Sequence, residues 1–155
     1  MMPNLNIPLS RLLRRKIRRL WNLPSIAKKL NLSVARQQSL RNQFLGLDSK
    51  NRKLLLLKKE RDNYDYRVID LADVQDCSVK KEYGSISAGD LQTKGLNHYL
   101  KSISLRLGFK SGAKTVDVNF YESSYHTMRQ QTLLEAAARK WERFVSEHLQ
   151  KPAAA

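Results

Sequence analysis

The last long helical pattern of the chain spans Thr127 to Gln150 and reads TMRQQTLLEAAARKWERFVSEHLQ. Apolar side chains and one histidine recur there at three- and four-residue steps, which places them on one side of a helix. They are Leu134, Ala137, Trp141, Phe144, Val145, His148 and Leu149. A helix with one broad apolar face needs a partner that covers it. We expect that partner to be a sheet, because the stretches before the helix have the pattern of strands.

The stretches between residues 43 and 122 change from a helical period to a strand-like one. The predicted strands cover residues 43–47, 53–59, 64–70, 73–83, 99–110 and 115–122. A polar turn at 48–52 and a glycine-containing loop at 84–95 separate some of them. Strands that follow one another without intervening helices usually pair antiparallel. The sequence therefore predicts a mainly β domain closed by one C-terminal helix.

The first forty residues differ in composition and in period. Helices are predicted over 11–22, 25–30 and 34–42, with Ser10, Ser25 and Ser33 in position to cap them. We therefore divide the chain into a basic, helical N-terminal segment (1–40), a β domain (41–150) and a short tail (151–155). Because the strands and the closing helix lie within residues 41–150, we expect that fragment to fold by itself.

Positive charge is concentrated at the N-terminal side. The whole chain carries a formal net charge of +15. Met1 to Lys53 holds thirteen basic residues and one acidic residue, Asp48, so this part contributes +12 and the remainder contributes +3. Such an asymmetric charge attracts polyanions over long range, and salt screens the attraction.

The order of these pieces resembles a pleckstrin-homology (PH) domain over about residues 41–150. Phe44–Leu47 and Lys53–Lys58 look like the first hairpin of that family, and Arg67–Leu71 followed by Cys77–Val79 is similar to its third and fourth strands. Trp141 matches the tryptophan that the family carries in its capping helix. The resemblance implies a partly open antiparallel barrel of about six or seven strands, capped by a C-terminal helix. It says little about activity, because that scaffold binds lipids, peptides and proteins alike.

Some members of that family hold phosphoinositide headgroups with basic residues in the first hairpin. Here Lys50, Arg52 and Lys53 match the second half of the pattern, at the opening of the second strand. The lysine expected at the end of the first strand is missing, because Leu45–Leu47 occupies that place and Arg41 comes too early. This departure puts specific inositide binding in doubt. The three residues remain candidates for contact with an anionic surface, against the alternative of a solvated polar turn.

The predicted helix at 11–22 has two unlike sides, one apolar with Trp21 and one cationic. The cationic side consists of Arg11, Arg14, Arg15, Arg18 and Arg19. This pattern is typical of a helix that lies on an anionic membrane surface, where each basic residue contributes on the order of 1 kcal/mol. Two alternatives stay open: the apolar side packs onto the domain, or the segment is a targeting presequence.

The three predicted N-terminal helices also resemble a helix-turn-helix. Ile26–Ser33 has the spacing of a second helix and turn, and Arg36, Gln37, Gln38 and Arg41 would then face bases or phosphates. Gln37 and Asn31 depart from that pattern, standing where an aliphatic residue and a glycine are expected. DNA binding through this segment is the alternative function.

The chain offers few candidates for catalysis or for metal binding. His98, His126 and His148 are dispersed, and the single cysteine, Cys77, lies in a predicted strand. No phosphate-binding glycine loop and no zinc-ligand spacing occurs in the sequence. One cysteine and no long apolar run favour a cytoplasmic protein, either soluble or peripheral to a membrane.

We therefore expect a non-enzymatic binding module without catalytic residues, metal or cofactor. Its expected partner is an anionic one, either lipid headgroups or an acidic protein surface, with nucleic acid as the alternative.

Overall fold

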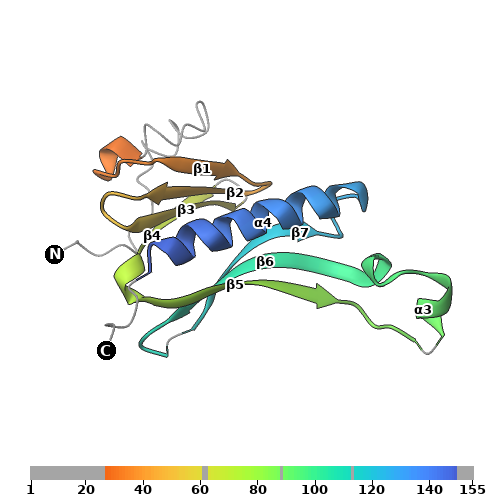
Figure 1. Cartoon of the computed structure of the whole chain (residues 1–155). Coiled ribbons are helices and arrows are strands. Elements are labelled where there is room, and N and C mark those ends of the chain that lie inside the picture. The colour runs from red at the N-terminus through yellow and green to blue at the C-terminus, as the bar shows by residue number, and fades with distance from the viewer. Residues whose placement is uncertain (1–26, 61–62, 88, 113, 150–155) are drawn as a thin grey trace, which may run out of the picture. The chain divides into compact units, whose positions relative to one another are not determined.

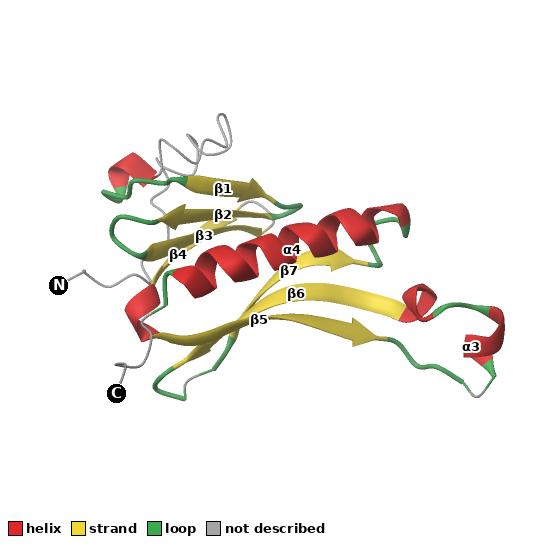
Figure 2. Cartoon of the chain, viewed as in Figure 1, coloured by secondary structure: helices red, strands yellow, loops and turns green. Residues whose placement is uncertain are grey.

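The structure is a computed structural model that describes residues 27–60, 63–87, 89–112 and 114–149. It divides between Ala72 and Asp73 into two compact units. Within the described residues, seven strands form two antiparallel sheets, one in each unit, rather than one closed barrel (Figures 1 and 2). The expected mainly β class with a long C-terminal helix is confirmed.

The first sheet is a meander in which each strand pairs with the next one along the chain. Its strands are β1 (Arg36–Ser39), β2 (Gln43–Asp48), β3 (Lys53–Glu60) and β4 (Asn63–Asp70). Because neighbouring strands run in opposite directions, the turn between β1 and β2 lies at one end of the sheet and the turn between β2 and β3 at the other. We call these the β1–β2 end and the β2–β3 end.

Buried side chains lie on both faces of this sheet. One face carries Leu55, Leu57 and Val68. The cross-strand register places a second set of five residues on the other face. These are Leu45, Leu47, Leu54, Leu56 and Ile69, all of them buried. A strand that is buried on both faces has a continuous apolar sequence, which explains the four successive leucines at 54–57.

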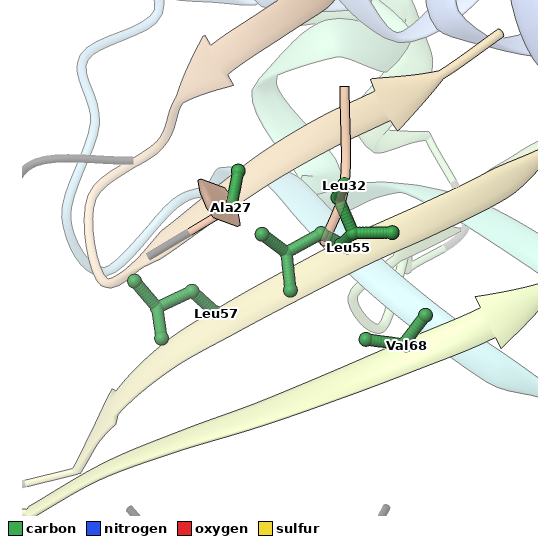
Figure 3. Close-up of a cluster of buried hydrophobic side chains, with 5 residues drawn as sticks. All are labelled: Ala27, Leu32, Leu55, Leu57 and Val68. Carbon is green, nitrogen blue, oxygen red and sulfur yellow. The ribbon is translucent and has the colours of Figure 1, made fainter. Parts of the chain in front are cut away.

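The first of these faces is covered by residues 27–34, which we call the strap. Ala27 and Leu32 of the strap join Leu55, Leu57 and Val68 in one buried cluster (Figure 3). Residues 27–29 form a helical turn, in agreement with the helix predicted over 25–30. The N-terminal side of the chain is therefore part of the core of the first unit, at least from Ala27 onward.

The helix predicted over 34–42 is wrong. Arg36–Ser39 forms the strand β1, which pairs with β2 so that Arg36 lies opposite Leu47 and Ser39 opposite Phe44. The edge of β2 offers this segment backbone hydrogen bonds that outweigh its weak helical preference. The helix-turn-helix therefore lacks its recognition helix. The division expected between residues 40 and 41 falls inside the β1–β2 hairpin.

The second sheet is formed by β5 (Val74–Tyr83), β6 (Leu100–Phe109) and β7 (Val116–Glu122), in that order. The helix α4 (Arg129–Glu147) packs against all three strands. Between β5 and β6 the chain forms two short helices, α3 (Asp90–Thr93) and η2 (Leu96–Tyr99), and η1 (Leu71–Asp73) precedes β5. The helix expected to close the sheet thus packs on three of the predicted strands, while the strands predicted at 43–47, 53–59 and 64–70 belong to the sheet of the first unit.

The buried side of α4 lies close to the predicted one. Trp141 is 2% exposed, and Phe144 and Val145 are also buried. Ala138 is buried while Ala137 is half-buried, and the buried side continues to Gln131, a residue that the apolar pattern missed. The Gln131 amide can be buried because its Nε2 donates to Tyr121 Oη and to the Asn97 carbonyl oxygen, each at 3.0 Å.

We predict that Trp141→Ala lowers the free energy of unfolding by about 3–5 kcal/mol, because the substitution leaves a large cavity in a well-packed core. Urea denaturation followed by circular dichroism measures this change. The matched control is Ser146→Ala on the exposed side of α4, which should change the free energy by less than about 0.5 kcal/mol. Equal effects of the two substitutions would contradict the packing of α4 described above.

We also predict that two N-terminal truncations behave differently. A fragment beginning at Ser25 retains the strap and β1 and should unfold cooperatively. A fragment beginning at Arg41 loses β1 together with buried Ala27, Leu32 and Leu40. Contrary to the expectation from the sequence, this fragment should lose cooperativity or become insoluble, because one face of β3 would be exposed. Cooperative melting of the shorter fragment with an unchanged midpoint would show that the strap is dispensable.

Candidate functional site

The turn at the β2–β3 end is organised by the carboxylate of Asp48, which is 1% exposed. Asp48 Oδ1 accepts a hydrogen bond from the Asn51 backbone N–H at 2.9 Å, and Oδ2 accepts one from Asn51 Nδ2 at 2.8 Å. Oδ2 also accepts the backbone N–H of Ser33 at 3.0 Å, which joins the end of the strap to this turn. Burial opposes the charge, but the hydrogen bonds from Asn51 and Ser33 hold the pKa of Asp48 below its usual value.

The three basic residues predicted in this turn are brought close together but differ in surroundings. Lys50 is exposed. Arg52 is half-buried and has a left-handed backbone with φ of 56°, as the tight turn requires. Lys53 Nζ lies 3.4 Å from Asp70 Oδ2 across the β3–β4 pair. Part of the positive charge of the turn is therefore already balanced by a carboxylate.

The other predicted site residues lie outside the described part of the chain. They are Arg11, Arg14, Arg15, Arg18, Arg19 and Trp21. Their proposed contact with an anionic surface stays a prediction.

Four other basic residues of the first unit are exposed, in the turn at 27–32 and at the β1–β2 end. Lys28 and Lys29 are exposed in the helical turn that begins the described chain, and Arg41 is exposed in the β1–β2 turn. Lys59 is exposed at the end of β3, and its backbone N–H donates to the Asn42 carbonyl oxygen at 2.7 Å. The sequence missed that Arg41 and Lys59 lie at the same end of the sheet, because it predicted a helix over 34–42.

In the second unit, carboxylates of α4 attach the helix to the edge strand β5. The Val79 backbone N–H donates to Glu142 Oε2 at 2.7 Å. Lys81 Nζ lies 2.6 Å from Glu135 Oε1, and this contact, opposed by burial, holds the pKa of Glu135 below its usual value. Val79 and Glu142 are 63 residues apart in the chain. These contacts stabilise the unit and leave no carboxylate pair set up for acid–base catalysis among them.

The cysteine is not poised for nucleophilic chemistry. Burial, Glu142 and Asp76 together raise the pKa of Cys77 to about 12. A thiol with such a pKa is almost entirely protonated at neutral pH, and the thiolate is the reactive form. Cys77 is therefore a packing residue of β5.

The end of β5 and its connection to β6, which includes the loop predicted at 84–95, carry several exposed apolar side chains. Tyr83, Ile86 and Leu96 are each more than a third exposed. Asp90 Oδ2 accepts the Ser87 backbone N–H at 2.9 Å, and the Gly84 N–H donates to the Tyr99 carbonyl oxygen at 2.7 Å. Local hydrogen bonds thus shape this connection, which the sequence predicted as irregular.

Among the residues that the structure describes, no group of three or more His, Cys, Asp or Glu side chains is placed to hold a metal ion. No helix in the same residues has the length and apolar character needed to cross a membrane. Comparison of the chain with protein-family models, with curated proteins and with solved structures finds no match.

We predict that acid destabilises the first unit through Asp48. Because its pKa is lower in the folded state than the ordinary 3.8, its stabilising contribution is fully present well above pH 3.8. That contribution is lost as the pH falls through the folded-state pKa. At pH 7, Asp48→Asn should cost about 1–3 kcal/mol, because an amide NH2 would then face hydrogen-bond donors that the carboxylate accepts.

The measurement is urea denaturation of both proteins between pH 2.5 and 7. The difference in free energy of unfolding between wild type and Asp48→Asn should shrink at the acid end of this range. A difference that stays constant with pH would show that the charge of Asp48 is not responsible for its effect.

Proposed function

We propose that the chain is a non-enzymatic binding module held near an anionic surface by its basic N-terminal segment. The proposal rests on the uneven distribution of net charge between the two structural units. Up to Ala72 the sequence has seventeen basic and five acidic residues, a net charge of +12, and from Asp73 onward the net charge is +3. One unit is therefore strongly cationic and the other is nearly balanced, which favours a division between attachment and docking.

The PH-like architecture is part of this proposal. It is supported by the order of elements, with four strands in one meander, three in the next and a final helix that carries the buried Trp141. The first hairpin matched in the sequence is formed by β2 and β3, so the strap and β1 precede the matched part. A docking role for the module is supported by the exposed apolar side chains between β5 and β6, because exposed apolar groups are typical of interaction surfaces.

We propose lipid headgroups of a membrane as the anionic surface. An acidic protein surface carries the same sign of charge and is the second candidate. The Trp21-bearing side of the 11–22 pattern supports a membrane, because such a side chain inserts between lipids while arginines contact phosphates. A cytoplasmic location at the membrane periphery belongs to this proposal. The helix-turn-helix alternative is not carried forward, since residues 36–39 form a strand.

We predict that the full chain co-sediments with vesicles containing phosphatidylserine, does not co-sediment with neutral phosphatidylcholine vesicles, and dissociates as salt is raised. Trp21→Ala should weaken the binding by about tenfold or more, because the lost apolar burial is worth roughly 1.5–3 kcal/mol. The control is Leu133→Ala, which removes an apolar side chain that is 72% exposed on α4.

Equal effects of Trp21→Ala and Leu133→Ala would contradict insertion of the N-terminal segment. Retardation of duplex DNA at salt concentrations that abolish vesicle binding would favour a nucleic acid as the polyanion. Binding to an acidic polypeptide but not to the anionic vesicles would favour a protein partner.

A further inference from the structure

Gln131 joins the short helix η2 to the start of α4. Its amide Nε2 donates to the Asn97 carbonyl oxygen and to Tyr121 Oη, each at 3.0 Å. At the same end of the second sheet, the Ser123 N–H donates to the Lys101 carbonyl oxygen at 2.9 Å, so the turn between β7 and α4 lies beside the start of β6. These contacts bring η2, the end of β7 and the first turn of α4 together at one end of the second unit.

Three exposed apolar side chains lie close to these contacts, and we call them the apolar end surface: Leu96, Tyr125 and Met128. Each is between 45% and 49% exposed. Leu96 directly precedes Asn97. The Met128 carbonyl oxygen accepts the Gln131 N–H at 3.1 Å. Tyr125 directly precedes His126, whose ring stacks on Tyr121 with 5.7 Å between the ring centroids. The buried amide of Gln131 therefore ties together the three segments that carry these side chains.

Exposed large apolar side chains are unevenly distributed between the two units. Within the described residues, all of them belong to the second unit. Groups of such side chains are typical of interaction surfaces, and tyrosine and methionine are enriched at protein interfaces. The second unit therefore offers an apolar surface, whereas the first unit offers positive charge.

Three exposed basic residues lie beside the apolar end surface: Lys94, Lys101 and Arg129. Lys94 precedes Leu96 by two positions, and Arg129 directly follows Met128. None of the three forms an ion pair with a carboxylate of the described residues. The nearby carboxylates of Asp90 and Glu122 each accept a hydrogen bond from their own segment. The charge available to a partner at this end is therefore positive.

We infer that the apolar end surface binds a segment of a partner protein in which apolar side chains are flanked by Asp or Glu. The apolar side chains of such a segment pack on Leu96 and Met128, and its carboxylates face the three basic residues. This inference rests on the proposed function, because it gives the docking role of the module a surface and a partner chemistry.

A protein segment fits this surface better than a bilayer or a second copy of the chain. Half-buried side chains lie level with their surroundings, whereas insertion into a bilayer needs apolar side chains that protrude. A second copy would bring together two molecules of net charge +15, whose like charges repel each other. A segment that carries carboxylates is instead attracted to this end.

The test selects peptides from a displayed library of random sequences on the full chain, at about 0.15 M salt to screen long-range attraction. The selected peptides should combine apolar residues with several Asp or Glu. In the surface variant, Leu96→Ala and Met128→Ala are combined. This variant should bind synthetic copies of the peptides about tenfold more weakly or worse, as measured by fluorescence anisotropy. The control Leu133→Ala removes an exposed apolar side chain on the side of α4 opposite Gln131, and it should leave the affinity unchanged.

A second pair of variants tests the charges. In the charge variant, Lys94→Glu, Lys101→Glu and Arg129→Glu together should weaken binding of the same peptides by about tenfold or more. Its control makes the same change of net charge in other parts of the chain and should weaken binding by less than about threefold. The control substitutions, all at exposed lysines, are Lys50→Glu, Lys59→Glu and Lys114→Glu. Circular dichroism melts show whether each variant folds.

If no peptide is selected, or if the peptides bind the surface variant as well as the wild type, the inference is overturned. The proposed attachment is then decided separately by binding of the full chain to phosphatidylserine vesicles. Vesicle binding that is lost in the surface variant would show that a bilayer occupies the surface instead. Self-association that is lost in the same variant, measured by sedimentation velocity, would assign the surface to a second copy. If the wild type binds no anionic vesicle while peptide binding follows the expectation, the membrane attachment fails and the docking surface stands.

Discussion

The hydrogen bonds that Asp48 accepts from Ser33 and Asn51 fix the geometry on which the first unit depends. They join three pieces of chain: the end of the strap, the end of β2 and the turn into β3. A carboxylate this deeply buried is stable as an anion only where backbone and side-chain donors surround it. The strap is therefore held by a polar contact at Ser33 and by the burial of Ala27 and Leu32 in the cluster with Leu55, Leu57 and Val68. The Leu32 N–H donates to the Ala27 carbonyl oxygen at 2.8 Å and closes the strap into a turn.

The meander separates basic residues of the first unit. It places Lys50, Arg52 and Lys53 at one end of the sheet, and Arg41 and Lys59 at the other. At the β2–β3 end, Lys53 is paired with Asp70 and the turn is shaped by backbone requirements. At the β1–β2 end, Arg41 and Lys59 are exposed.

In the second unit, β5 lies at the edge of its sheet. An unpaired strand edge invites association with other chains. Here the α4 carboxylate of Glu142 accepts the Val79 N–H, and Glu135 pairs with Lys81 along the same strand. The helix thus packs its apolar side on the sheet and satisfies part of the strand edge with its acidic flank. Arg106 and Asp117 form a bidentate pair between β6 and β7, with distances of 2.8 and 3.0 Å.

The sequence by itself determined the elements whose patterns are strong and local. The three- and four-residue period around Trp141 predicted α4, and the alternation near Leu105 and Val118 predicted β6 and β7. The prediction of a polar turn after Asp48 was also correct, because Asp, Asn and Ser are typical turn residues. These features depend on residues within a few positions of one another, so a single stretch is sufficient to reveal them.

The tertiary structure decided what depends on contacts distant in the chain. Arg36–Ser39 has no strand pattern, and it becomes β1 because the edge of β2 supplies hydrogen-bond partners. The burial of Gln131 depends on Tyr121 and Asn97, which no helical period indicates. The position of the strap depends on Asp48 and on the cluster with Leu55, Leu57 and Val68, all distant from it in the chain. Composition revealed the excess of positive charge, but folding decided which lysines share one end of the sheet.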